Sequence, residues 1–260
     1  MLVLHARKAG GTTVAQELKR AGCSFEEHEW GPFRLNGTNK FTVLIARDPI
    51  RRAVSSYLFE GGAPQCWYTK PPAWRRPVSV GMELLERCLP RYSKLAPFEV
   101  YLNASLRVWE RGQPLTTLTE QRGLSHRGYM MGRVFVPNYL VRKLADGRAD
   151  LALARKRLDA YVDAVVLNGK LCVLGAQKNT PACVSRVHWG ATWSAEGFVH
   201  KATPFDAALS IVKRELAKEV TLRHRATLNR LLHMDNQLYH QLAARCASFS
   251  EPSIHLPTSP

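Results

Sequence analysis

The sequence lacks the features of several specialised protein classes. No run of about 18 apolar residues occurs, which is the length needed to cross a bilayer, and no charged-then-apolar signal peptide opens the sequence. None of the 6 cysteines forms a Cys-x-x-Cys pair, so a zinc finger or ribbon is not expected. With 17 glycines and 6 cysteines in 260 residues, collagen-like and disulfide-scaffold classes are excluded. The 45% apolar content is enough for one sizeable core.

Acidic residues are also scarce, and this imbalance bears on the partners. The chain has 21 Asp and Glu against 37 Lys and Arg, a formal charge of +16. Anionic partners are therefore expected, among them nucleic acid, an anionic lipid surface, a phosphorylated cofactor or a sulfated glycan. A well-solvated basic surface would give the same charge. No zinc-finger, RNP or KH signature is present, so nucleic acid is not the expected partner.

The order of apolar runs and breakers predicts an α/β fold with a mostly parallel sheet. Strands are expected over residues 1–5, 24–30, 41–46 and 164–167. Helices are expected over 14–21, 50–59, 98–110, 136–144, 150–161, 205–224 and 226–247, with a short helical piece at 80–88. Residues 60–97 are rich in Gly, Pro and Trp and are predicted to form an irregular insertion or lid. One domain over 1–247 and a flexible tail over 248–260 are expected.

The first candidate site is the glycine-rich turn after the first strand. Its residues are Lys8, Ala9, Gly10, Gly11, Thr12 and Thr13. Two glycines let the backbone approach a ligand closely, and the N-terminus of the next helix attracts an anion. The segment is not a Walker A motif, because GxxxxGK[ST] is absent and the Lys precedes the glycines. It predicts a phosphate cradle, although a purely structural strand-to-helix turn has the same appearance.

The second candidate site follows the apolar strand at 41–46. Arg47 stands at the strand end, and Ser55 lies eight residues later on the next helix, so both side chains can converge on one anion. The alternatives are an ordinary ion pair between Arg47 and Asp48, and a small residue in helix packing for Ser55.

Together the two motifs resemble the signatures of Golgi-type carbohydrate sulfotransferases. His5 to Thr13 is similar to HxPKTGGTT, and Arg47 to Tyr57 is similar to RDPxxRxxSxY. Two weaker likenesses follow, Asn138-x-x-x-Arg142-x-Leu to a family segment and Asp235-x-x-Leu-Tyr239 to its C-terminal helix. The nearest group is that of the heparan sulfate 2-O-sulfotransferase and chondroitin sulfotransferases, and the family fold is P-loop-NTPase-like.

The resemblance implies a cofactor and a reaction. The first segment would bind the 5′-phosphosulfate of 3′-phosphoadenosine 5′-phosphosulfate (PAPS), and Arg47 and Ser55 its 3′-phosphate. Lys8 would neutralise the leaving phosphate, and no metal is expected. The acceptor would be a hydroxyl of an anionic or neutral glycan, and the location the Golgi lumen or membrane.

A general base is needed to take the proton of the acceptor hydroxyl. His28 is the candidate, because it lies between the cradle and the Arg47 strand, as the catalytic His does in that family. Its neighbours Glu26 and Glu27 are alternatives. His5 is expected to support the cradle, and a loop with Lys201 and Thr203 to close over the 3′-phosphate.

The sequence departs from the family in several places. The family Pro-Lys-Thr is Arg7-Lys8-Ala9 here, so one hydroxyl is lost. The family membrane anchor and stem are not present in this chain, and a truncated N-terminus is expected. The sequons at Asn36 and Asn103 add a little weight to a secretory location, while the cysteines fit either disulfides or buried thiols. The alternative functions are a P-loop NTPase or small-molecule kinase, and a basic anion-binding module without activity.

Overall fold

The computed structural model describes the sheet, the helices that cover it and a few isolated positions. The described residues are 1–6, 9–29, 31–33, 40–60, 98, 102, 115, 136–174, 179–187, 189, 193–194, 197–198 and 204–248. The predicted insertion at 60–97, the helical pieces at 80–88 and 98–110 and the tail at 248–260 lie almost entirely outside these ranges.

A five-stranded sheet with the order β2-β1-β3-β4-β5 forms the centre of the molecule. The strands β1 (Leu2–His5), β2 (Glu26–His28), β3 (Thr42–Ala46) and β4 (Ala164–Leu167) are parallel to their neighbours. The last strand, β5 (Lys170–Val173), pairs antiparallel with β4. The predicted α/β class with a mostly parallel sheet is confirmed.

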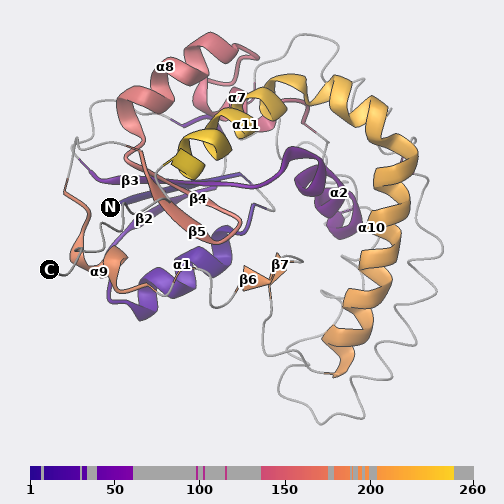
Figure 1. Cartoon of the computed structure of the whole chain (residues 1–260), viewed down its shortest axis with the longest axis horizontal. Helices are drawn as coiled ribbons and strands as arrows, with labels where there is room; N and C mark the ends of the chain where they lie inside the picture. Colours follow the sequence, from indigo (N-terminus) through magenta and orange to yellow (C-terminus); the bar gives the residue numbers. More distant parts are fainter. Residues whose placement is uncertain are drawn as a thin grey trace, which may run out of the picture.

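Helices cover both faces of the sheet (Figure 1). One face carries α1 (Gly11–Arg20) and α9 (Ala182–Ser185), and the other carries α7 (Tyr139–Leu144), α8 (Leu151–Tyr161) and α11 (His233–Ser248). Successive strand residues point to opposite faces, so Val3 packs on the side of α1 and Leu4 on the side of α7. Each fully buried aliphatic side chain of this kind stabilises the fold by about 1.5–3 kcal/mol.

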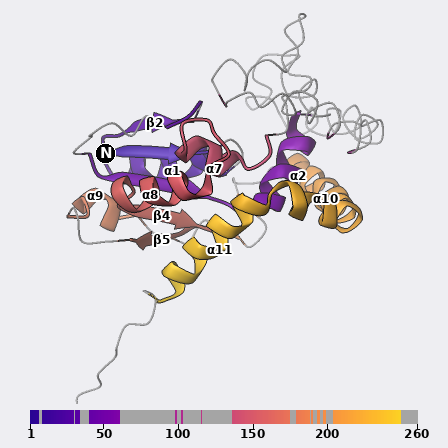
Figure 2. The ribbon, with the colours of Figure 1, turned by 90° about the horizontal axis from the view of Figure 1, so that it is seen from above.

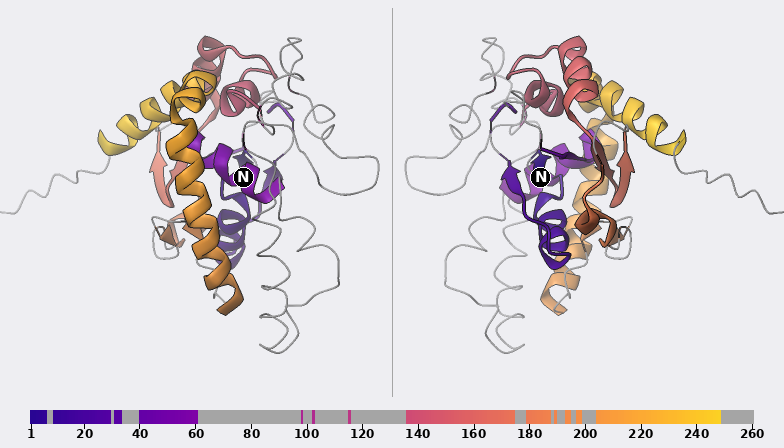
Figure 3. Two further views of the ribbon diagram at one scale, coloured as in Figure 1. Left: turned by 90° about the vertical axis from the view of Figure 1, so that its right-hand side faces the viewer. Right: turned by 90° about the vertical axis from the view of Figure 1, so that its left-hand side faces the viewer.

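Two further helices pack together beyond the end of β3 (Figures 2 and 3). There α2 (Pro49–Glu60) lies against α10 (Pro204–Leu231), around a core that includes Ala53 and Leu228. A short hairpin, β6 (Trp193–Ser194) with β7 (Gly197–Phe198), completes the described elements. No helix within the described ranges is long and apolar enough to cross a membrane.

The predicted helix boundary near residue 225 is wrong. The helix α10 continues to Leu231, and α11 begins at His233. The break is determined by a distant residue, because the side-chain oxygen of Asn138 accepts hydrogen bonds from Met234 N (3.0 Å) and Asp235 N (3.2 Å). A cap supplied from 95 or more residues away leaves no local signal in the sequence.

One disulfide links two elements that cover the sheet, and a second links the sheet to a covering helix. Cys23, just after α1, pairs with Cys183 on α9, and Cys172 on β5 pairs with Cys246 on α11. The links span 160 and 74 residues of sequence, so each restricts the unfolded chain strongly. Of the two possibilities for the cysteines, the structure therefore has bridges at four of the six.

Removing the second bridge is expected to destabilise the protein. The double variant Cys172→Ser/Cys246→Ser should lose about 2–5 kcal/mol of unfolding free energy, measured by urea denaturation without reductant. With reductant present, the variant and the wild type should differ much less. Thiol labelling of the denatured, unreduced wild type should find no more than two free cysteines. Six free thiols in protein secreted through an oxidising compartment would contradict both bridges.

Candidate functional site

The glycine turn lies where β1 meets α1. Gly10 has a φ of 103°, a conformation that suits glycine, and it caps the N-terminus of α1. The hydroxyl oxygen of Thr13, in the first turn, is buried and has no hydrogen-bond partner within the described residues. Thr13 N donates to the carbonyl of Gly10 at 3.2 Å. The helix N-terminus, with the positive end of its dipole and a buried hydroxyl, suits a bound anion.

His5 supports this turn from below, as expected. A Cβ on Gly11 would lie 2.3 Å from Cε1 of His5, so only glycine fits against the ring. The ring is 3% exposed, and its Nε2 lies 2.8 Å from Oε1 of Glu27 on the neighbouring strand. The imidazole is therefore held between the turn and β2, and it fixes where α1 begins.

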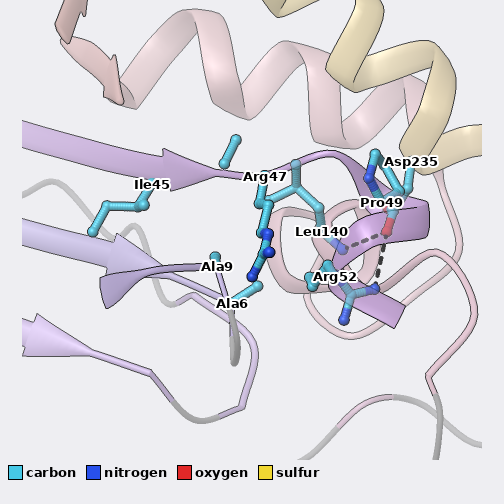
Figure 4. Close-up of a pocket in the computed structure, with 9 residues that line it drawn as sticks. Ala6, Ala9, Ile45, Arg47, Pro49, Arg52, Leu140 and Asp235 are labelled. Carbon is cyan, nitrogen blue, oxygen red and sulfur yellow. Dashed lines mark hydrogen bonds and ion pairs between the residues drawn. The ribbon is translucent and has the colours of Figure 1, made fainter. Parts of the chain in front are cut away.

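Arg47 projects from the end of β3 into a small pocket beside the glycine turn. Figure 4 shows its side chain extending toward Ala6 and Ala9. Burial lowers the pKa of the Arg47 guanidinium from its usual value, and the nearby charge of Arg51 acts in the same direction. A partly buried arginine at the carboxyl end of a parallel strand is well placed to bind an anionic group.

The pocket brings together all four sequence segments that carry the family resemblance. Ala6 and Ala9 come from the first segment, Arg47 and Arg52 from the second, Leu140 from the third and Asp235 from the fourth; Ile45, Ala46 and Pro49 complete the lining (Figure 4). These segments are up to about 230 residues apart in the chain. Their convergence at the carboxyl ends of β1 and β3 is the main structural observation about the site.

The third segment lies at the start of α7 and the fourth at the start of α11, and each caps the other helix. Asn138 caps the start of α11, as described above, and it adopts a φ of 52° to do so. In return the carboxylate of Asp235 accepts hydrogen bonds from Leu140 N (3.1 Å) and Val141 N (2.9 Å) at the start of α7. Each helix thus satisfies the free amides of the other, and this fixes α7 and α11 relative to each other.

Asp235 also joins this pair of helices to α2. Its side chain is fully buried, and Nη2 of Arg52 lies 3.6 Å from its Oδ2. The guanidinium of Arg52 stacks over the ring of Tyr139, 4.7 Å from its centroid. Burial raises the pKa of the Asp235 carboxyl, while Arg52 and the two amides oppose that shift. The buried carboxylate of Asp235 on α11 therefore connects this helix to α7 and α2 beside the pocket.

The candidate base His28 lies at the end of the edge strand β2. In the sheet it is level with Leu4, and its ring meets Phe33 edge-on at 5.4 Å between centroids. The side chain is half-buried, and Nδ1 is buried with no hydrogen-bond partner within the described residues. Burial lowers the pKa of His28, and the charge of Lys143 lowers it further. Both effects favour the neutral imidazole that a general base requires.

The two alternative bases are already engaged. Oε2 of Glu26 is 2.7 Å from Nζ of Lys40, and this hydrogen bond lowers the pKa of Glu26. Glu27 contacts His5 on the opposite face of the sheet from His28. A carboxylate held by a lysine, as Glu26 is, is a weaker base. The geometry therefore favours His28 over either glutamate.

Several predicted site residues are not brought into this constellation. Ser55 lies half-buried on the second turn of α2, and it is not among the described residues that line the pocket around Arg47. Thr12 is placed in the first turn of α1, but its side chain lies outside the described set. Lys8, Lys201 and Thr203 lie outside the described residues altogether.

Sequence reasoning missed Lys143, a buried cation on α7. The side chain is fully buried, and its Nζ lies over the rings of Phe33 and Tyr139. A signal was present, because Tyr139, Leu140, Lys143 and Leu144 occupy one helical face by spacing. A lysine in the middle of an apolar helical face is therefore a candidate for a buried charged residue.

Comparison with protein-family models, curated proteins and solved structures returns no match for this chain. Within the residues that the structure describes, no group of three or more His, Cys, Asp or Glu side chains could hold a metal ion. Any function assigned to the chain therefore has to come from its own residues and their arrangement.

Proposed function

We propose that the protein is a PAPS-dependent sulfotransferase with a P-loop-NTPase-like fold, which transfers a sulfuryl group to a hydroxyl of a carbohydrate. The observation that carries this proposal is the pocket at the carboxyl ends of β1 and β3. Four separate segments resembling sulfotransferase signatures contribute to its lining, and a chance likeness would give no reason for them to meet. The glycine turn and Arg47 supply anion-binding groups from two sides.

The residues present fit the phosphorylated donor substrate. The turn Lys8–Thr13 would hold the 5′-phosphosulfate through the first amides of α1, with the hydroxyl of Thr13 as a further donor. Arg47 and Ser55 would hold the 3′-phosphate. The proposal assigns binding of the anions to these side chains and to the helix N-terminus, with no metal required.

Proton transfer and charge stabilisation complete the proposed mechanism. Nε2 of His28 accepts the proton of the acceptor hydroxyl as its oxygen bonds to sulfur, and the bond from sulfur to the 5′-phosphate oxygen breaks. The electron pair of that bond stays on the phosphate, where Lys8 and the N-terminus of α1 neutralise the charge. The products are a sulfate ester, adenosine 3′,5′-bisphosphate and a protonated His28.

Nucleotide binding in EDTA tests the donor site. We expect calorimetry to show binding of adenosine 3′,5′-bisphosphate without Mg²⁺, and Arg47→Ala to weaken it by about 10- to 150-fold, the equivalent of one charge-assisted hydrogen bond. Because Arg47 is assigned to the 3′-phosphate, adenosine 5′-monophosphate should be affected far less.

The controls separate this proposal from its alternatives. Arg51→Ala is the matched variant, because Arg51 is an exposed arginine four residues further along the chain, in the first turn of α2; it should change binding little. If Arg47→Ala loses the same affinity for both nucleotides, Arg47 does not bind the 3′-phosphate. Binding of ATP that needs Mg²⁺, with no binding of the bisphosphate, would favour a kinase or NTPase instead. Binding without transfer from radiolabelled PAPS to any glycan panel would favour an inactive anion-binding module.

The acceptor and the location belong to the same proposal. We propose a glycan acceptor, anionic or neutral, in the lumen of the Golgi. The disulfides Cys23–Cys183 and Cys172–Cys246 support this location, because such bridges persist in oxidising compartments. The charge of +16 supports an anionic partner.

A further inference from the structure

Among the lysines whose side chains the structure describes, only Lys143 is buried. Its side chain is fully buried, with Nζ 5.2 Å from the ring centroid of Phe33 and 5.0 Å from that of Tyr139. Nζ donates a hydrogen bond to the backbone carbonyl of Glu29. Lysine is almost never fully buried unless its charge is compensated, and here two aromatic faces and a carbonyl provide the compensation.

The same groups surround His28. Glu29, whose carbonyl accepts from Lys143, is the residue next to His28. Phe33, whose face meets the ammonium group, also meets the His28 ring edge-on at 5.4 Å, and its N–H donates to the Lys143 carbonyl at 2.8 Å. Lys143 is therefore anchored to the segment that carries His28 through one side-chain and one backbone hydrogen bond.

We propose that Lys143 is a positioning residue for His28, which anchors Glu29 beside the base and places a buried ammonium group against the same Phe33 ring that meets the His28 imidazole. This inference rests on the proposed function in taking His28 as the general base. Lys143 itself touches neither substrate in the proposal. It acts through electrostatic repulsion of the protonated imidazole and by holding Glu29 and Phe33 in place.

The charges around His28 support this direction. Lys143 on α7 and His5 on β1 both oppose protonation of His28, while Glu26 on β2 favours it. Glu26 is the exposed member of this set and is paired with Lys40, so solvent weakens its effect. The ammonium of Lys143 is shielded from water, where the same charge acts more strongly. The pKa of His28 is lowered by burial first and by Lys143 second.

An NMR titration of His28 in the full chain tests the inference without any activity assay. We expect Lys143→Met, which keeps the length and removes the charge, to raise the titration midpoint of His28 by about one pH unit. Lys143→Arg, which restores a charge, should return the midpoint toward that of the wild type. Lys40→Met is the matched control, since Lys40 is an exposed lysine beside the same strand, and it should move the midpoint far less.

The outcomes separate this inference from the proposed function. A Lys143→Met midpoint equal to that of the wild type, or a shift that Lys40→Met reproduces, would overturn it even if sulfuryl transfer is found. If Lys143→Met does not fold, Lys143→Gln, which also removes the charge but keeps a hydrogen-bond donor for the Glu29 carbonyl, takes its place in the same titration. A midpoint raised above that of the wild type supports the inference, and an unchanged midpoint overturns it. In an active enzyme, the acid limb of the rate profile should move upward with the midpoint, which a purely structural defect would not cause.

Discussion

His28→Ala is expected to lower the turnover of sulfuryl transfer by about 10²–10⁴-fold, the usual contribution of a general base. Nucleotide affinity should change little, because His28 lies on β2, whereas the proposed anion-binding groups lie at the start of α1, directly after β3 and on α2. The measurement is the steady-state rate with saturating PAPS, together with calorimetry of adenosine 3′,5′-bisphosphate. An equal loss of rate and nucleotide affinity would indicate a disturbed donor site instead of a missing base.

If His28 is the base, the rate of sulfuryl transfer should also depend on pH in a defined direction. Burial and Lys143 lower the pKa of His28 below the ordinary histidine value of about 6.5. A base must be neutral, so the wild-type rate should rise with pH through a midpoint below 6.5 and be nearly flat at neutral pH. In His28→Ala that limb should disappear.

The matched controls for His28 are its two neighbours on β2. Glu26→Gln and Glu27→Gln should keep most of the activity, since Glu26 pairs with Lys40 and Glu27 with His5. If either variant loses activity to the degree expected of His28→Ala, and His28→Ala does not, the base is that carboxylate.

Asp235→Ala is expected to destabilise the fold by about 3–5 kcal/mol, the cost of leaving one member of a buried ion pair without its partner. The substitution removes the carboxylate that faces the buried guanidinium of Arg52 and accepts from the amides of Leu140 and Val141. Equilibrium urea denaturation measures the loss. Asp235→Asn should lose less, because its amide oxygen still accepts one of the hydrogen bonds.

Asp159→Ala is the matched control, at an ion pair that also joins α11 to a neighbouring helix. Asp159 on α8 forms an exposed ion pair with Arg245 on α11, with 2.5 Å between Oδ1 and Nη1. Exposed pairs contribute about 1 kcal/mol or less, so this variant should remain close to the wild type. Equal losses in Asp159→Ala and Asp235→Ala would show that burial and capping add nothing at Asp235.

One strand that the sequence analysis missed was within reach of sequence reasoning. Asn168-Gly169 joins β4 to β5, and both residues have positive φ, at 47° and 79°. Asn-Gly between two apolar runs is the strongest short-range signal for a two-residue hairpin. The strand β5 therefore could have been predicted, together with its antiparallel pairing to β4.

Other features depended on contacts between distant segments. The start of α11 is set by Asn138, and the place of α7 by Asp235, so neither end could be located from neighbouring residues. The apolar spacing of α7 indicated a buried face, but nothing in the sequence indicated that Lys143 would lie beneath Phe33 and beside the carbonyl of Glu29.

By itself the sequence determined the α/β class, the strands β1, β3 and β4, and the glycine turn, because apolar runs, glycines and a strand-end arginine act through local geometry. Only the tertiary structure decided which of these residues share a pocket and which carboxylates are already engaged by cations. It also decided which two pairs of cysteines are bridged. These properties depend on strand order and helix packing, which bring together residues that are about 20 to 230 positions apart and that no local pattern connects.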